Sequence, residues 1–257
     1  MKLAHQLVTL QTLVRKETGR VTRIWVQTIV PPIITMSLYF VIFGNLIGRR
    51  IGQMDGFDYM QYIAPGLIMM SVIQNAYGNV VSSFFGAKFQ KHLEEMLVSP
   101  MPTWSIILGH ISGGVYRGLI VGSIVTMIAL FFTKLQIVNI FVTVSIVVLT
   151  AIVFALAGLI NAIFARKFDD ISIIPSFVLA PLTYLGGIFY SISLLPEFAQ
   201  KVSLFNPILY MVNAFRYGML GVSDIDIRMA YGITIVFIVV LFGLCTILIN
   251  RGVGIRE

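Results

Sequence analysis

The sequence of 257 residues contains few charged residues and a single cysteine. Charged residues make up 11% of the chain, whereas soluble domains carry roughly 25%. Apolar residues make up 58%, and the mean hydropathy is +0.92. Cys245 lies within an apolar run, so one chain can form neither an internal disulfide nor a thiolate metal site. These values exclude a soluble domain and indicate an all-α integral membrane protein.

Catalytic and metal-binding motifs are also missing. The chain has no G-x-x-x-x-G-K-[ST] loop to hold nucleotide phosphates, no H-E-x-x-H and no G-x-S-x-G. Its three histidines, His5, His92 and His110, do not have the spacing of metal ligands. We therefore expect no enzyme activity, metal or cofactor on this chain, so any ATP must be hydrolysed by another subunit.

Long apolar runs divide the chain. A bilayer core of about 30 Å requires about 20 helical residues. Six runs are long enough, and they predict transmembrane helices at about 24–47, 59–85, 104–132, 137–165, 171–195 and 229–250. Together they form a six-span transmembrane domain over 24–257. Pro175, Pro181 and the pair Gly186-Gly187 predict a kink in the fifth span. Residues 191–228 contain only short apolar patches, which predicts external re-entrant helices before the last span.

Basic residues predict the orientation of these spans. Of the 18 lysines and arginines, six spans would place eleven on the side of the N-terminus, six on the other side and one, Arg117, within a span. The positive-inside rule then predicts that both termini are cytoplasmic. Because the basic residues lie between apolar runs, we expect them to contact the lipid bilayer and not nucleic acid.

The N-terminal residues 1–23 have the pattern of an amphipathic helix. Leu3, Leu7, Leu10 and Val14 follow one another at spacings of four, three and four, which places them on one helical face. This pattern predicts a cytoplasmic helix that lies on the membrane surface.

Several polar residues interrupt the apolar runs. No aspartate or glutamate lies within a predicted span, which removes the residue that an ion-coupled carrier would use. Gln74, Asn75 and Asn79 lie close to one helical face, where interhelical hydrogen bonding is the simpler interpretation and cargo contact the alternative. Arg117 should face the protein interior or water, and both structural pairing and a functional role remain open. Gly114, Gly118 and Gly122 stand four residues apart, which predicts a close helix contact.

A densely charged run, KFQKHLEEMLVSPMP at 88–102, lies between the second and third spans. Phe89, Leu93, Met96 and Leu97 follow the i, i+4, i+7, i+8 pattern of a short amphipathic helix, and the prolines end it. Periodicity alone favours a helix lying on the membrane surface. Lys91 precedes Glu95 by four residues, the weaker order for a helical ion pair, so these charges suit a partner.

Three segments together resemble the permease subunits of bacterial ABC-type-2 exporters. They are LEEMLVSPMP after the second span, LGGIFYSISLLPEF at the end of the fifth, and FNPILYMVNAFRYG before the sixth. The resemblance covers nearly the whole chain. It implies a multi-pass protein of the bacterial inner membrane that acts as a homodimer with a dimer of separately encoded ABC ATPases. ATP and Mg would bind to those ATPases, and the cargo would be of the drug, lipid or glycan class.

The resemblance also assigns site residues. Residues 88–102 would be the coupling helix that docks on the ATPase, through Lys88, Gln90, Lys91, Glu94, Glu95, Leu97 and Pro100. Asn206, Pro207 and Arg216 match the external re-entrant motif. With them, the expected translocation path or gate comprises Gln74, Asn75, Asn79, Arg117, Pro175 and Pro181. The alternative is a membrane anchor or assembly protein that recruits a soluble partner and transports nothing.

Overall fold

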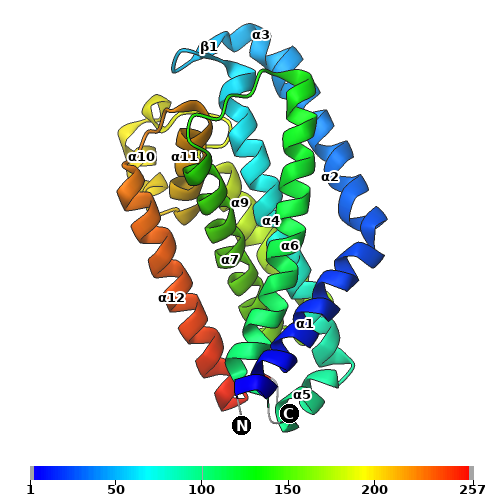
Figure 1. The fold of residues 1–257 in the computed structure, drawn as a ribbon. Helices are drawn as coiled ribbons and strands as arrows, with labels where there is room; N and C mark the ends of the chain where they lie inside the picture. Colours follow the sequence, from blue (N-terminus) through cyan, green and yellow to red (C-terminus); the bar gives the residue numbers. More distant parts are fainter. Residues whose placement is uncertain (1–2, 100, 255–257) are drawn as a thin grey trace.

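The computed structural model describes residues 3–99 and 101–254, which form a helical bundle (Figure 1). The helices are, in chain order, α1 (Leu3–Arg23), α2 (Trp25–Tyr39), the π-helical η1 (Phe40–Ile47), α3 (Gly48–Ile51), α4 (Tyr59–Phe89), α5 (His92–Val98), α6 (Thr103–Phe132), α7 (Ile140–Phe164), α8 (Asp170–Ile174), the π-helical η2 (Pro175–Leu179), α9 (Ala180–Tyr184), the 3-10 helix η3 (Ile192–Leu194), α10 (Glu197–Ser203), α11 (Pro207–Leu220) and α12 (Ile227–Arg251).

The all-α prediction is confirmed, with one small exception. Within the described residues, the strands are the two-residue β1 (Gln53–Met54) and β2 (Phe57–Asp58), which pair antiparallel. Asp55 and Gly56 form their turn with φ of 50° and 81°, and glycine tolerates that left-handed conformation. This hairpin, which the sequence analysis did not predict, lies with α3 and α10 at one end of the bundle, whereas α5 lies at the other (Figure 1).

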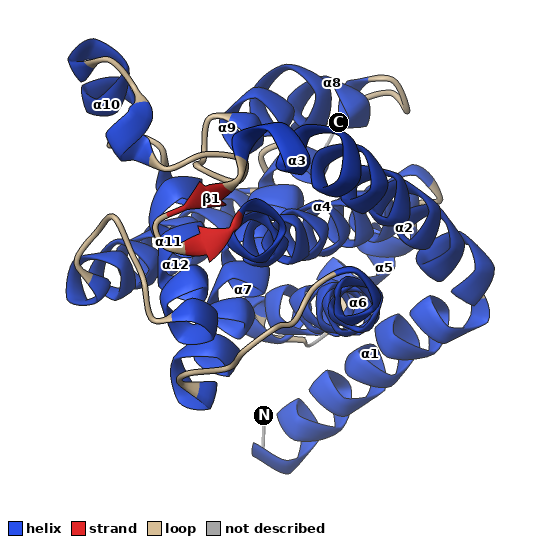
Figure 2. Ribbon diagram, turned by 90° about the horizontal axis from the view of Figure 1, so that it is seen from above, coloured by secondary structure: helices blue, strands red, loops and turns tan. Residues whose placement is uncertain are grey.

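Within the part of the chain that the structure describes, four helical segments are long and apolar enough to cross a membrane: Trp25–Gly44, Thr103–Phe132, Ile140–Phe164 and Ile227–Arg251. They lie within the predicted first and fourth spans and extend the predicted third and sixth spans by one or two residues at an end. The second predicted span lies in α4, whose 31 residues extend for about 46 Å. α4 lies among α6, α7 and α11 (Figure 2), and most of its residues are buried.

The fifth predicted span, 171–195, is only partly helical, in keeping with the expected break. Its helical part, Asp170–Tyr184, has 15 residues and a length of about 22 Å, which is short of the bilayer core of about 30 Å. The predicted kink is confirmed, since the helix turns π-helical at Pro175 and Pro181 lies in α9. Gly187 then takes a φ of 71°, and the chain leaves the helical path there.

The segment before the last helix contains the two helices α10 and α11. α11 has 14 residues, nearly all of them buried, and packs against α4, α7 and α12. The Asn206 side chain caps its first turn by accepting a hydrogen bond from the Ile208 N–H at 3.0 Å. Gly221 ends the helix in the left-handed conformation. α11 is therefore a short helix enclosed by the bundle.

Glycines of α6 allow α4 and α6 to approach closely, as their spacing predicts. A Cβ added to Gly114 would lie 2.8 Å from the Ala76 carbonyl oxygen and 2.6 Å from Cγ2 of Val80. Both distances are shorter than van der Waals contact, and the carbonyl belongs to the backbone, which cannot move aside easily. The glycine seam therefore serves packing within one chain.

We expect Gly114→Ala to lower the free energy of unfolding by about 1–3 kcal/mol, since the added methyl group pushes α6 away from α4. Gly78→Ala is the matched control, because nothing lies within 4 Å of a Cβ at that position of α4. Unfolding of the purified proteins in a mild detergent measures the difference. Equal stability of the two variants would contradict this account of the seam.

Candidate functional site

The first candidate site is the α5 end of the molecule, where α1 begins and α12 ends (Figure 1). The predicted helix starting at Lys88 is wrong in its boundary: Lys88 and Phe89 are the last residues of α4, and α5 begins at His92. Lys91 separates the two helices with a left-handed φ of 61°. α5 is thus a separate helix that follows α4 after a break of two residues.

α5 is anchored on one side and exposed on the other. Leu93 is buried, and Leu97 is half-buried against the same apolar cluster. Gln90, Lys91, Glu94 and Glu95 are exposed. Pro100 lies outside the described residues. The structure therefore gathers most of the residues predicted to contact an ATPase on one accessible surface.

Lys88 was also predicted to contact the ATPase, but its ammonium group makes hydrogen bonds within the chain. Its Nζ donates hydrogen bonds to the carbonyl oxygens of Ile163 at 2.8 Å and Ala165 at 2.6 Å. These carbonyls are at the C-terminal end of α7, where a cation satisfies free acceptors and the helix dipole. Lys88 therefore joins α4 to α7 next to α5.

A polar pocket of about 260 Å³ adjoins α5, and it is lined by Lys88, Phe89, Lys91, Glu94 and Arg166, among others. Beside it, the exposed rings of Phe89 and Phe168 pack edge to face with centroids 5.0 Å apart. The exposed charges and aromatic rings together form a surface on which a protein partner can dock.

The connection after α7 is held in place next to this surface. The Asp170 carboxylate accepts hydrogen bonds from the backbone N–H groups of Arg166 at 2.8 Å and Lys167 at 2.9 Å. These two bonds hold the pKa of the exposed Asp170 carboxyl below its usual range. Asp170 thus keeps its charge and fixes the loop that carries Arg166 and Phe168.

A second cluster of polar side chains joins α1 to α4 and α6. Glu17 of α1 is 1% exposed, and its carboxylate accepts a hydrogen bond from Ser83 at 2.5 Å. It also lies 3.5 Å from Nε of Arg20 and 3.5 Å from Nδ1 of the buried His110. Arg20 donates to the carbonyl and side-chain oxygens of Asn79 at 2.9 and 2.8 Å. Asn79, which the sequence analysis placed in the path, is therefore buried in this joint.

Sequence reasoning missed Glu17 and His110, although a signal existed. The packed face of α1 contains Leu13, Glu17 and Val21, all buried and four residues apart. The face predicted from Leu3 to Val14 instead leaves Leu7 54% exposed, which suits contact with lipid. A carboxylate in register with buried apolar residues indicates a buried pair.

The third candidate site is a groove at mid-height in the bundle, between α2, α4 and α6. Its volume is about 240 Å³, and its lining includes Gln74, Asn75 and Arg117 with Pro31 and Pro32. Nε of Arg117 donates a hydrogen bond to Oδ1 of Asn75 at 3.2 Å. The structure therefore brings together three of the residues that the sequence placed in the path, next to two prolines of the first span.

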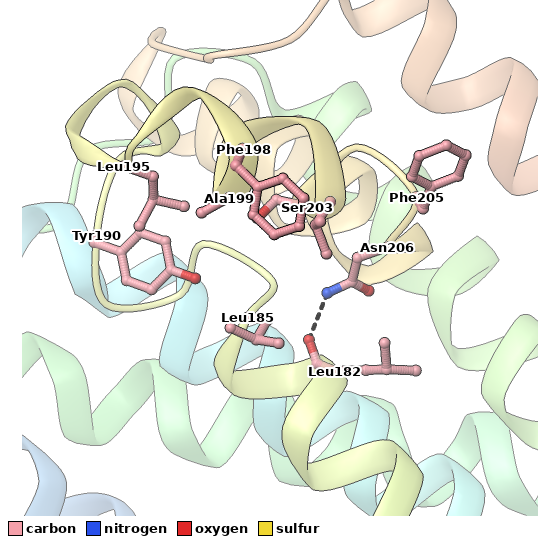
Figure 3. A pocket seen from close by; sticks show the side chains of 10 residues that line it. Leu182, Leu185, Tyr190, Leu195, Phe198, Ala199, Ser203, Phe205 and Asn206 are labelled. Atoms are coloured by element: carbon pink, nitrogen blue, oxygen red, sulfur yellow. Dashed lines mark hydrogen bonds between the residues drawn. The ribbon is translucent and has the colours of Figure 1, made fainter.

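The fourth candidate site lies at the α10 end of the bundle. An apolar pocket of about 360 Å³ lies between α9 and α10, and Figure 3 shows its lining of Leu182, Leu185, Tyr190 and Phe198 with Asn206 at one side. Nδ2 of Asn206 donates to the Leu182 carbonyl at 2.6 Å (Figure 3). Pro207 is the first residue of α11, a position where its missing N–H costs nothing.

Arg216 fixes α11 to two other segments. It is fully buried, its Nη2 donates to the Gly187 carbonyl at 2.5 Å, and its guanidinium carbon lies 4.0 Å above the Tyr62 ring of α4. Both contacts suit a buried guanidinium. The predicted gate residues Asn206 and Arg216 therefore connect α11 to α9, to the Gly187 turn and to α4. Pro175 and Pro181 shape the kinked helix before that turn.

The fold defines a class before any comparison: the chain is a multi-pass helical membrane protein whose outer elements enclose a buried helix. The family model of the ABC-2 type transporter matches residues 8–220, so the chain belongs to this family. Inner membrane transport permease YadH of Escherichia coli (strain K12) is 59% identical over 251 residues, which are 97% of this chain and 98% of that protein. Nodulation protein J of Rhizobium leguminosarum bv. viciae is 23% identical over 215 residues, 83% of each chain. The protein is therefore a transport permease of the inner membrane and not a member of an enzyme family.

We expect Glu17→Ala to lower the free energy of unfolding by about 3–5 kcal/mol, because it removes the anion that neutralises the buried side of the α1 joint. The control is Glu197→Ala in α10, which removes an exposed carboxylate. Unfolding in detergent measures both. A loss in Glu17→Ala no larger than that of the control would contradict a structural role for the joint.

Proposed function

We propose that the chain is the membrane subunit of an ATP-driven exporter that moves a drug, lipid or glycan outward. It acts as a homodimer with a dimer of separately encoded ABC ATPases, which bind ATP and Mg. The chain itself carries no cofactor. Membership in the ABC-2 type transporter family and the similarity to a transport permease support this proposal.

In the proposed topology the chain crosses the membrane six times and both termini are cytoplasmic. The crossings are α2 with η1, α4, α6, α7, the segment from α8 to Tyr190, and α12. The fifth crossing is only partly helical, and the enclosing α11 shields its irregular backbone from lipid. The start of α1 and the end of α12 lie at the same end of the bundle, which supports an even number of crossings (Figure 1).

The observation that carries the proposal is the connection between α5 and α4. The exposed α5 follows directly after α4, the helix with the most buried residues of the long ones. A force applied to α5 therefore acts on the centre of the bundle. We infer that the ATPase docks on Gln90, Lys91, Glu94, Glu95 and the neighbouring aromatic rings.

α4 extends to the α10 end of the bundle, where the ring of Tyr62 lies against the guanidinium of Arg216 in α11. Movement of α4 would shift Tyr62 relative to Arg216 and loosen α11 from the Gly187 turn. In the proposed cycle, ATP binding closes the ATPase dimer, displaces α5 and α4, and opens this end for cargo release. The link is mechanical because close-packed helices shift as units.

Replacing Glu94 and Glu95 together by glutamine should reduce copurification with the partner ATPase by about tenfold, because two charge-assisted contacts are lost. The partner to test is any Walker-type ATPase that a neighbouring reading frame encodes. The matched control is Asp58→Asn with Glu197→Gln, which removes two exposed carboxylates at the other end. Copurification from detergent extracts and ATP turnover in proteoliposomes are the measurements.

Unchanged copurification and unchanged ATP turnover in the Glu94 and Glu95 variant would contradict the proposed docking surface. A wild-type permease that recruits the ATPase without altering its turnover would instead indicate a membrane anchor. Recruitment and ATP turnover are both measured on the same sample, so recruitment without a change in turnover can be recognised.

A further inference from the structure

Arg117 lies midway along α6, where an arginine costs roughly 2.5–3.5 kcal/mol on membrane-insertion scales. A charge at this depth normally has an acidic partner or several acceptors. Within the described parts of the chain, Arg117 makes no ion pair, and its hydrogen bond is the one from Nε to Asn75. Its terminal nitrogens thus have no acceptor among these residues.

Arg20 and Arg216, which also contact α4, each use a terminal nitrogen in a hydrogen bond within the described residues, although Nε of each makes none. Arg216 has the Gly187 carbonyl and the Tyr62 ring, and Arg20 has Glu17 and Asn79. Arg117 differs from both, because its terminal nitrogens have no acceptor among the described residues.

The groove next to Arg117 has room and further polar groups. Its volume of about 240 Å³ exceeds the roughly 30 Å³ of a water molecule, so it can hold a small head group. Gln27 and Gln74 also line it. Pro31 and Pro32 have no N–H, so the carbonyls of Gln27 and Thr28 lose their helical donor. The groove therefore offers donors to an anion and acceptors to adjacent hydroxyls.

An apolar stripe runs beside the groove on the neighbouring face of α2. Val30, Ile34 and Leu38 are exposed and stand four residues apart, so they lie along the helix axis. A molecule with a polar head at Arg117 can lay an apolar tail along this stripe. The combination of a positive polar groove and an apolar stripe suits an amphipathic molecule.

We propose that the groove between α2, α4 and α6 binds an anionic oxygen head group, a phosphate or a carboxylate, through the terminal nitrogens of Arg117. This inference rests on the proposed transport function, since it names the chemistry of the cargo. Asn75 positions the guanidinium through Nε, which leaves the fork of terminal nitrogens for a bidentate contact with the anion.

The test measures binding of fluorescent phosphatidic acid to the purified permease in neutral detergent, with diacylglycerol of the same tails as the uncharged comparison. Wild type should bind phosphatidic acid more tightly than diacylglycerol. Arg117→Gln should weaken phosphatidic acid binding by about tenfold or more and leave diacylglycerol binding unchanged. Arg117→Lys should retain more affinity than Arg117→Gln. Arg228→Gln, which removes an exposed arginine, is the control.

Competition with inorganic phosphate distinguishes two sources of the anion. Full competition at millimolar concentration identifies a site for free anions, whereas weak competition identifies a site that also requires the tail. Both results support the anion site. Equal phosphatidic acid affinity of wild type and Arg117→Gln would overturn it.

A different measurement tests the proposed transport function. ATPase copurification and turnover are measured on wild type and on Arg117→Gln, which leaves the α5 surface intact. A permease that never alters ATP turnover but binds phosphatidic acid through Arg117 would retain the anion site and lose the exporter. If the permease alters ATP turnover but its binding of phosphatidic acid does not depend on Arg117, the exporter is retained and the anion site is overturned.

Discussion

Polar groups at membrane depth must find partners within the protein, because hydrocarbon supplies none. The buried helix α4 meets this constraint at three levels. Tyr62 faces Arg216, Asn75 faces Arg117, and Asn79 faces Arg20. The three arginines come from α11, α6 and α1, so these contacts connect α4 to each of those helices. The rest of the bundle is arranged around these contacts.

The same contacts explain how a short exposed helix can affect a distant end of the molecule. α5 has few buried residues of its own, yet it is continuous in sequence with α4. α4 in turn is held by the Arg20 joint near α5 and by the Arg216 contact at the other end. In the proposed mechanism, a displacement at α5 would pass through the short connection at Gln90 and Lys91 to the packed helices and charge contacts of α4.

Hydropathy predicted most of the helices because the apolar runs report the cost of placing each residue in lipid. It overestimated the helical length of the fifth span, since Ile188 and Ile192 are apolar for a different reason: they are buried in the same core cluster as residues of α11. The groove residues Gln74, Asn75 and Arg117 were predicted from their polarity alone. Glu17 and His110 were missed because their pairing joins α1 to α6, and a single sequence does not show contacts between distant segments. The engagement of Lys88 with α7 was hidden for the same reason.

The central claim is that α5 and α4 move as one unit that opens the α10 end. Spin labels test it directly, with one pair at Val98 and Gly78 and another at Phe198 and Met229, all exposed positions, and with the buried Cys245 left unlabelled. Distances are measured by pulsed electron paramagnetic resonance on the permease–ATPase complex, without nucleotide and with ATP. The account predicts that ATP leaves the Val98–Gly78 distance unchanged and shifts the Phe198–Met229 distance. A change between Val98 and Gly78 with no change at the other pair would contradict it.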